Sequence, residues 1–213
     1  MKGRIWAIGD IHGQLARLEE LFQLISLDPD QDELVFMGDY IDRGPDSKGV
    51  IDRLLALKKS GLKATFLKGN HEEMFLKDFL TGANPQLYLY NGGLATLKSY
   101  AQPGQDPLEA RPPAEHMDFL ENLNLYYRRG GYLFAHAGLK PGQPLEDQDS
   151  HDLLWIREEF FLVSHDWPEK VVFGHTPFRE PFRRGKLFGI DTGAAYGGRL
   201  TCLVLPDEKF IQA

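Results

Sequence analysis

Residues 4–13, Arg-Ile-Trp-Ala-Ile-Gly-Asp-Ile-His-Gly, run from a short apolar stretch directly into a polar turn with two glycines. Residues 15–25 follow, with apolar side chains at helical spacing. The same order returns twice along the first third of the chain, at residues 34–37 and 50–57 and at residues 64–67 and 74–80. This rhythm predicts strand–helix units whose strands pair in parallel.

Each of these predicted strands ends in a polar turn that contains glycine. The three turns are Gly9-Asp10-Ile11-His12-Gly13, Gly38-Asp39-Tyr40-Ile41-Asp42-Arg43-Gly44 and Lys68-Gly69-Asn70-His71-Glu72. Open α/β sheets bind ligands beyond the carboxyl ends of their strands, so we expect the three turns to meet at one crevice.

The remainder of the chain has a different character. Residues 81–124 are rich in proline and glycine and contain two predicted helices, at 94–100 and 114–123, which we interpret as a helical, cap-like insertion. Further short strands are predicted at 132–135, 170–173, 187–190 and 200–205, and we expect them to form a second, largely antiparallel sheet. We interpret residues 1–213 as a single α/β domain in which the two sheets pack together.

Two later strands also end in a histidine and a turn, Phe134-Ala135-His136-Ala137-Gly138 and Phe173-Gly174-His175-Thr176-Pro177. Taken alone, each of the five turns could be an ordinary turn, and each histidine a hydrogen-bonded core residue. Together they offer a mixed oxygen and imidazole donor set, which suits manganese, iron or zinc better than calcium. The donors are Asp10, His12, Asp39, Asn70, His136 and His175.

Other residues of similar chemistry lack such a setting. His116, His151 and His165 do not follow an apolar run in a glycine turn, and we assign them no functional role. Cys202 is the only cysteine and lies in an apolar run, so we expect it to be buried and inert. Asp191-Thr192-Gly193-Ala194 follows a predicted strand and could either border the crevice or be a plain turn.

The ordered set of five turns, spread from residue 9 to residue 176, resembles the phosphoprotein phosphatase family of calcineurin-like metallophosphoesterases. The resemblance implies a central β-sandwich of two mixed sheets flanked by helices, in four α/β/β/α layers. It also implies two divalent metal ions, expected to be manganese, with iron or zinc as alternatives. Asp10 and His12 would hold the first metal, Asp39 would bridge both, and Asn70, His136 and His175 would hold the second.

The resemblance further implies roles in substrate binding and catalysis. Arg43, Asn70 and, by its position after residues 153–156, Arg157 would bind the substrate phosphate. Asp42 would orient His71, which would protonate the leaving oxygen as a general acid. The implied reaction is in-line attack on phosphorus by a hydroxide that bridges the two metals.

The leading functional hypothesis is a protein serine/threonine phosphatase. A symmetrical diadenosine tetraphosphatase is the nearest alternative, but residues 40–44, with Asp42, and residues 174–176 favour the phosphatase. Residues 91–100 also resemble bacterial members of that branch, although an ordinary helix entry explains them equally well. A protein that binds a phosphorylated partner without turnover is a more distant alternative, because no donor is missing.

The net charge and the apolar stretches of the chain limit the classes of molecule that we expect it to bind. A formal net charge of −7 argues against nonspecific nucleic-acid binding, which leaves a phosphorylated protein or a small phosphoester as the expected substrate. No apolar stretch approaches a membrane span, and residues 1–8 do not read as a secretion signal, so we expect a cytoplasmic protein. The chain has no segment resembling the eukaryotic C-terminal extension, and we expect no dedicated regulatory subunit.

Overall fold

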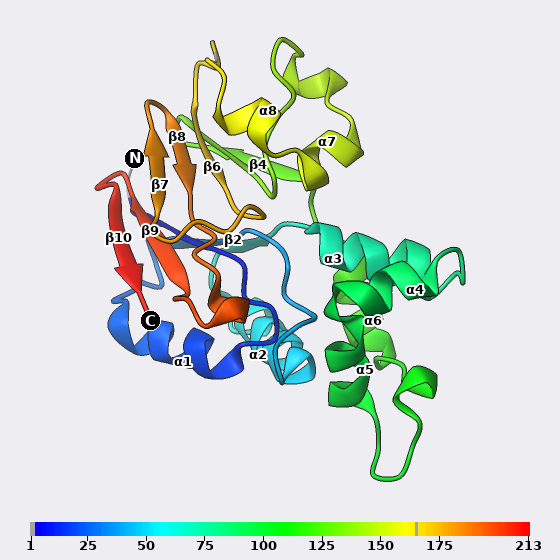
Figure 1. Cartoon of the computed structure of the whole chain (residues 1–213). Helices are drawn as coiled ribbons and strands as arrows, with labels where there is room; N and C mark the ends of the chain where they lie inside the picture. Colours follow the sequence, from blue (N-terminus) through cyan, green and yellow to red (C-terminus); the bar gives the residue numbers. More distant parts are fainter. Residues whose placement is uncertain (1–2, 165) are drawn as a thin grey trace.

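The computed structural model describes residues 3–164 and 166–213, in which ten strands form two five-stranded sheets packed face to face (Figure 1). The first sheet has the order β10-β9-β1-β2-β3. Its strands are β1 (Ile5–Ile8), β2 (Glu33–Phe36), β3 (Ala64–Phe66), β9 (Thr201–Leu205) and β10 (Lys209–Gln212). β1, β2 and β3 run parallel, as the strand–helix rhythm predicts, whereas β9 is antiparallel to both β1 and β10.

The second sheet has the order β4-β5-β6-β8-β7. Its strands are β4 (Tyr126–Arg129), β5 (Tyr132–Ala135), β6 (Lys170–Phe173), β7 (Phe182–Arg184) and β8 (Leu187–Gly189). The three central strands run parallel, and the two edge strands are antiparallel to their neighbours.

Two expectations about this second sheet are wrong. Its core is parallel rather than antiparallel, because helices in the long connection from β5 to β6 provide the crossover that parallel neighbours require. The strand at 200–205 belongs to the first sheet, because β9 is buried along its whole length and fills the place between β1 and β10.

Helices cover the outer face of each sheet. The α-helices are α1 (Leu15–Leu24), α2 (Ser47–Lys59), α3 (Asn70–Glu73), α4 (Pro85–Tyr88), α5 (Leu94–Tyr100), α6 (Ala114–Glu121), α7 (Ser150–Trp155) and α8 (Glu158–Phe161). The π-helical turns are η1 (Met74–Phe79) and η2 (Leu89–Gly93), and the 3₁₀ turns are η3 (Pro107–Glu109), η4 (Leu145–Asp147) and η5 (Ala194–Tyr196). The helix expected at 74–80 begins earlier, at Asn70, so that His71 lies in a helix and not in a loop.

Strand side chains alternate between faces and therefore form separate apolar layers. In β1, Ile5 and Ala7 face the other sheet, whereas Trp6 and Ile8 face α1 and α2. Leu133 and Ala135 of β5 face α7 and α8 in the same way. Figure 1 shows α1 and α2 on one side of the sandwich, α7 and α8 on the other, and α3 to α6 beside it. The protein is thus an α/β sandwich of two mixed sheets flanked by helices.

Within the described residues, no helix combines the length and the apolar character that a membrane crossing demands.

Candidate metal centre and active site

The turns that carry the predicted donors meet at the carboxyl ends of the parallel strands of both sheets. Hydrogen bonds link the turns directly: the backbone N–H of His175, after β6, donates to Asp10 Oδ2, after β1, over 2.9 Å. The ring Nδ1 of His136, after β5, lies 2.8 Å from the carbonyl oxygen of Met37 at the end of β2. The structure therefore brings residues from distant parts of the chain into one site.

The backbone of these turns is unusual. Of the described residues other than glycine, six have positive φ, and five of these belong to the predicted site: His12, Asp39, Asp42, Arg43 and His175. An L-residue in the left-handed region costs on the order of 1 kcal/mol or more and persists only where its surroundings enforce it. Left-handed backbone concentrated in this way is typical of a functional site.

Two glycines make room for the carboxylates. A Cβ atom on Gly69 would lie 2.0 Å from Asp39 Oδ1, and one on Gly174 would lie 2.1 Å from Asp10 Oδ1. Both distances are far below van der Waals contact, so any side chain at either position would displace a carboxylate.

Two groups of donor atoms share Asp39. Ligand atoms of His12, Asp39 and His71 lie within 4.8 Å of one another, and so do those of Asp39, His136 and His175. An aspartate common to both groups is the arrangement that a bridging ligand requires. The first group contains His71, whereas the family resemblance implies Asp10 in this position. The Oδ1 atom of Asp10 is buried and has no hydrogen-bond partner among the described residues.

Backbone carbonyls fix where two imidazole protons lie. Nδ1 of His12 is 2.9 Å from the carbonyl oxygen of Ile41, and Nδ1 of His136 makes the equivalent contact with Met37. A carbonyl can only accept, so both rings carry the proton on Nδ1 and turn the Nε2 lone pair towards the site. This is the tautomer that a metal-binding histidine needs.

Lone pairs converge inside the site. Nε2 of His136 lies 3.1 Å from Asn70 Oδ1 and 3.5 Å from Asp39 Oδ1, and with its proton on Nδ1 it cannot donate to either oxygen. Nε2 of His12 receives the guanidinium of Arg43 at 2.6 Å, so a cationic group already occupies one of these positions. Acceptors packed against acceptors favour a cation between them.

Buried polar atoms without partners support the same interpretation. The described part of the chain has four such side-chain atoms, and three lie here: Asp10 Oδ1, His71 Nε2 and His175 Nε2. Leaving a buried polar atom unpaired costs about 1–3 kcal/mol. The carboxylate, amide and imidazole donors therefore fit divalent first-row metal ions. That Asn70 and the other predicted donors bind metal in the implied grouping stays a prediction.

Burial sets the charge states of the imidazoles. It lowers the pKa of His12 to about 3, that of His175 to about 2 and that of His136 below its ordinary value. These rings are therefore neutral near pH 7, as metal ligands must be. Burial would raise the pKa of Asp39, but the surrounding histidines outweigh it and lower that pKa.

Asp42 and His71 form a buried pair. Asp42 Oδ2 lies 2.7 Å from His71 Nδ1, and the two side chains are 0% and 1% exposed. The Nδ1 proton therefore points at the carboxylate, and Nε2 faces the donor cluster. Burial lowers the pKa of His71, but the negative charges of Asp39 and Asp42 raise it to a net value above the ordinary one. The geometry can present a proton at Nε2.

Both predicted arginines border the site. The Arg43 guanidinium lies 5.1 Å from the centre of the Tyr196 ring, and its backbone N–H donates to Gly92 O over 3.2 Å. Arg157 directly precedes α8, and one of its Nη atoms lies 3.4 Å from Thr176 Oγ1, one residue after His175. Their binding of phosphate is a prediction that this arrangement permits.

Sequence reasoning missed Glu72. Its fully buried carboxylate accepts from the backbone N–H groups of Asp39, Tyr40 and Gly69 over 2.8–2.9 Å. It thereby joins the turn after β2 to the turn after β3. Burial raises the pKa of Glu72 to about 7, with the charge of Asp39 adding to this. Its place in the third turn was the one available signal.

Sequence reasoning also missed Tyr88 and Thr96, whose hydroxyls both donate to Asp42 Oδ1. They lie more than 40 residues away from Asp42 in the helical segment. The sequence gave no residue there a catalytic role, although residues 91–100 resemble bacterial members of the phosphatase branch.

The structure describes three of the four residues to which the sequence analysis assigns no role. His116 is buried between Tyr100 OH, at 2.8 Å, and Asp52 Oδ1, at 3.0 Å, as a hydrogen-bonded core histidine. His151 is exposed and stacks on Trp155. Cys202 is buried, and His165 lies outside the described residues.

Asp191, in the turn left open by the sequence, does border the site. It is buried, and its charge adds to the effect of burial in raising the pKa of the nearby Asp10.

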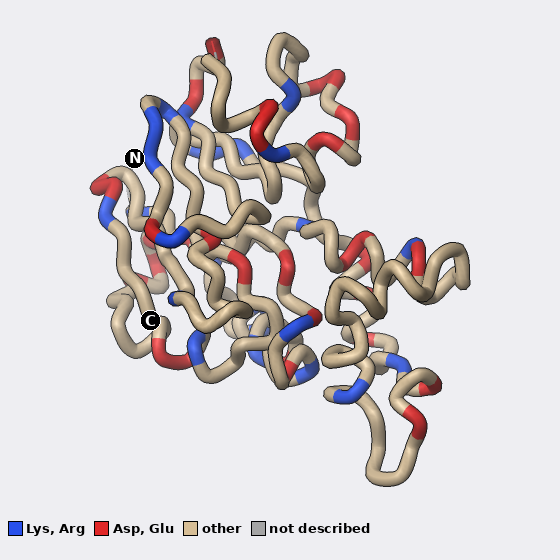
Figure 2. The backbone as a smooth tube through the Cα atoms, in the orientation of Figure 1, with Lys and Arg blue, Asp and Glu red and all other residues tan. Residues whose placement is uncertain are grey.

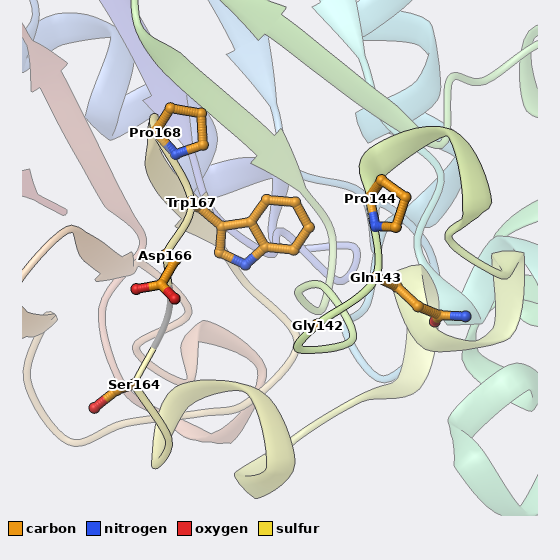
Figure 3. A pocket seen from close by; sticks show the side chains of 7 residues that line it. All are labelled: Gly142, Gln143, Pro144, Ser164, Asp166, Trp167 and Pro168. Carbon is orange, nitrogen blue, oxygen red and sulfur yellow. The ribbon is translucent and has the colours of Figure 1, made fainter.

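A cavity in another part of the molecule is separate from this site. A cavity of about 360 Å³ lies beside Trp167, and its lining residues, labelled in Figure 3, include none of the predicted donors. It lies near the beginning of β6, whereas His175 follows the end of that strand.

Figure 2 shows acidic and basic residues interspersed over both sheets and the helical segment.

A family model described as calcineurin-like phosphoesterase matches residues 3–199, which is most of the chain. The chain belongs to the calcineurin-like phosphoesterase family. It is therefore a metallophosphoesterase hydrolase.

Individual relatives of this phosphoesterase differ in the substrate that their names give. The chain is 34% identical over 207 residues to a serine/threonine-protein phosphatase 1 of Salmonella typhimurium, covering 92% of this chain and 89% of that one. It is 29% identical over 229 residues to an asymmetrical bis(5'-nucleosyl)-tetraphosphatase of Anoxybacillus flavithermus, covering 96% and 91%. A crystal structure provisionally assigned to a diadenosine tetraphosphatase superposes with a TM-score of 0.78 at 29% identity, covering 100% of this chain and 94% of that one.

Proposed function

We propose that this phosphoesterase hydrolyses phosphate monoesters and that its substrates are phosphoserine and phosphothreonine in proteins. The observation that carries the proposal is the buried pair of Asp42 and His71, with the His71 Nε2 atom facing the donor cluster. A serine or threonine alkoxide is a poor leaving group and must be protonated as it departs. A site with an oriented imidazole at this position supplies that proton.

The remaining residues would bind and orient the substrate. Two divalent ions, held by Asp10, His12, Asp39, Asn70, His136 and His175, would supply Lewis-acid polarisation of the phosphoryl group. We propose manganese, with iron or zinc as alternatives. Arg43 and Arg157 would add planar donors for phosphate oxygens, with Asn70 beside them.

Cleavage of a dinucleoside polyphosphate is the second candidate. Two of the relatives named above support it, because their descriptions specify tetraphosphatases. A nucleotide phosphate is a good leaving group and does not need a proton donor as strongly, so the Asp42 and His71 pair favours the monoester.

A substrate panel with the manganese-loaded protein tests this ranking. Phosphoserine and phosphothreonine peptides should be hydrolysed with higher kcat/KM than diadenosine tetraphosphate. A preference for the dinucleotide would overturn the proposal, and the products would show the cleavage site: two ADP for symmetrical cleavage, AMP and ATP for asymmetrical cleavage. Binding of phosphopeptide without turnover of any substrate would indicate the non-catalytic alternative.

We further propose a cytoplasmic enzyme that acts on a phosphorylated protein or small phosphoester without a dedicated regulatory subunit. The net charge of −7 supports partners other than nucleic acid.

A further inference from the structure

The helical segment beside the sandwich reaches into the active site at Asp42. Tyr88, the last residue of α4, donates its hydroxyl to Asp42 Oδ1 over 2.7 Å, and Thr96 of α5 donates to the same oxygen over 2.6 Å. His71 Nδ1 lies 2.7 Å from the other oxygen, Oδ2. One oxygen of the buried Asp42 carboxylate therefore binds the helical segment, and the other oxygen binds His71.

Proton counting fixes the direction of these hydrogen bonds. Asp42 Oδ1 can only accept, so the single hydroxyl proton of Thr96 points at it. Thr96 Oγ1 then accepts from the backbone N–H of Asp42 over 2.8 Å and from the hydroxyl of Ser47 over 2.9 Å. Thr96 therefore holds Asp42 at both its side chain and its backbone, and Asp42 is one of the residues with left-handed φ.

Packing immobilises Tyr88. Its ring is fully buried and lies 5.5 Å from the ring of Phe75 and 5.2 Å from that of Phe79. A Cβ atom on Gly93 would lie 2.3 Å from the Tyr88 ring, so the glycine allows the close approach. Burial, and then the charge of Asp42, raises the pKa of Tyr88 well above its ordinary value, and the phenol keeps its proton.

Hydrogen-bond donors in any arrangement around the Asp42 carboxylate would be enough to offset the cost of burying it. Here both hydroxyls bind one oxygen and leave the second to His71, which fixes the plane of the carboxylate and, through it, the plane of the imidazole ring. We propose that Tyr88 and Thr96 are positioning residues that act through Asp42 to aim His71 Nε2 at the leaving oxygen. The inference rests on the proposed role of His71 as the proton donor.

Two variants of the positioning residues test this, Tyr88→Phe and Thr96→Val, each assayed on a phosphoserine peptide and on p-nitrophenyl phosphate. We expect kcat for the phosphoserine peptide to fall about 10–100-fold, as for other residues that orient a catalytic group, with a much smaller fall for the nitrophenyl ester. Thr96→Ser keeps the hydroxyl and should restore most of the activity. Equal losses on both substrates would overturn the proposal.

Tyr100→Phe is the matched control. Tyr100 lies on α5 as Thr96 does, but its hydroxyl binds His116 and not the catalytic pair. Its removal should leave the ratio of the two kcat values unchanged. A change in that ratio as large as the one for Tyr88→Phe would mean that the helical segment acts only through general stability.

A measurement without turnover separates this inference from the proposed function. In the zinc-loaded protein, the His71 Nδ1 proton that faces Asp42 should give a downfield NMR resonance, identified by its loss in His71→Asn. The resonance should shift in Tyr88→Phe and Thr96→Val but not in Tyr100→Phe, whatever the substrate proves to be. An unchanged resonance in both positioning variants would overturn the inference, whereas a wild type without phosphomonoesterase activity would overturn only the proposed function.

Discussion

At the scale of single residues, the site combines donors that suit a metal with one imidazole whose geometry suits proton transfer. Asp42 orients His71, and the Nε2 atom of His71 has no hydrogen-bond partner among the described residues. Substitution of a predicted metal ligand should slow the hydrolysis of every substrate. Substitution of His71 should slow mainly the hydrolysis of substrates with poor leaving groups.

His71→Ala should slow hydrolysis of a phosphoserine peptide by about 10²–10⁴-fold, because the serine oxygen would leave without a proton. Hydrolysis of p-nitrophenyl phosphate should fall far less, since nitrophenolate leaves readily. Steady-state kinetics on both substrates provide the check. Losses of the same size would contradict the acid role.

Gly69→Ala and Gly174→Ala should each weaken metal binding about 10–100-fold, because the new methyl group would displace Asp39 or Asp10. Isothermal titration with manganese measures the effect. Gly104→Ala is the control: a Cβ there meets nothing within 4 Å, and its φ of +82° adds only backbone strain. Unchanged manganese affinity in both site variants would rule out this role for the glycines.

The donor residues could be predicted because each follows an apolar run in a glycine turn, a local signal that needs no knowledge of the fold. Tyr88 and Thr96 carry no such signal, and Glu72, although it lies in the third glycine turn, has nothing there that indicates its hydrogen-bond partners. Their roles depend on which backbone and carboxylate groups they meet in space, and Tyr88 and Thr96 meet Asp42 across 46 and 54 residues of sequence.

At the scale of secondary structure, Asp32 ties the start of β1 to the segment before β2. The Asp32 side chain is 3% exposed and accepts from Arg4 N, from Arg4 Nη2 and from Trp6 Nε1 over 2.7–2.9 Å. Burial would raise the pKa of Asp32, but these bonds, with one from the backbone N–H of Asp28, lower it to about 2 from 3.8.

Asp32→Asn should therefore lower the free energy of unfolding at pH 7 by on the order of 1–2 kcal/mol. Because the pKa of Asp32 is lower in the folded than in the unfolded state, its carboxylate stabilises the folded protein at pH values above the unfolded-state pKa. This contribution is lost as the pH falls from about 4 to about 2. Urea unfolding of both proteins at several pH values measures it. A difference that persists at pH 2 would contradict the linkage.

The strand–helix units of the first third were predictable because their periodicity is local. The place of β9 was not, because an apolar strand buried on both faces fits either sheet equally well from its sequence. The short α7 and α8 were missed because six and four residues are too few to show a helical period.

At the scale of the whole molecule, metal binding and stability should be linked. Burial raises the pKa of Asp10, and the negative charges of the buried Asp191 and Asp39 raise it further, so the folded protein without cations holds like charges together. Cations that bind only the folded state would relieve this.

Adding manganese at about 100 times its dissociation constant should stabilise the chelator-treated protein by about 2.7 kcal/mol. For a chain of this size that corresponds to a rise in Tm of roughly 5–10 °C, which thermal unfolding followed by circular dichroism can measure. Asp39→Asn, which alters the donor common to both groups, should show a much smaller rise. Equal Tm values with chelator and with manganese would contradict the proposed centre.

The membership of β9 in the first sheet bears on synthesis at the ribosome. β1, the central strand of this sheet, lacks one of its two neighbours until residues 201–205 have emerged, and His175 is synthesised almost as late. A nascent chain that ends before residue 175 would thus carry Asp10 and His12 without the predicted donor His175. We therefore expect hydrolytic activity to appear only after His175 and β9 have both been synthesised.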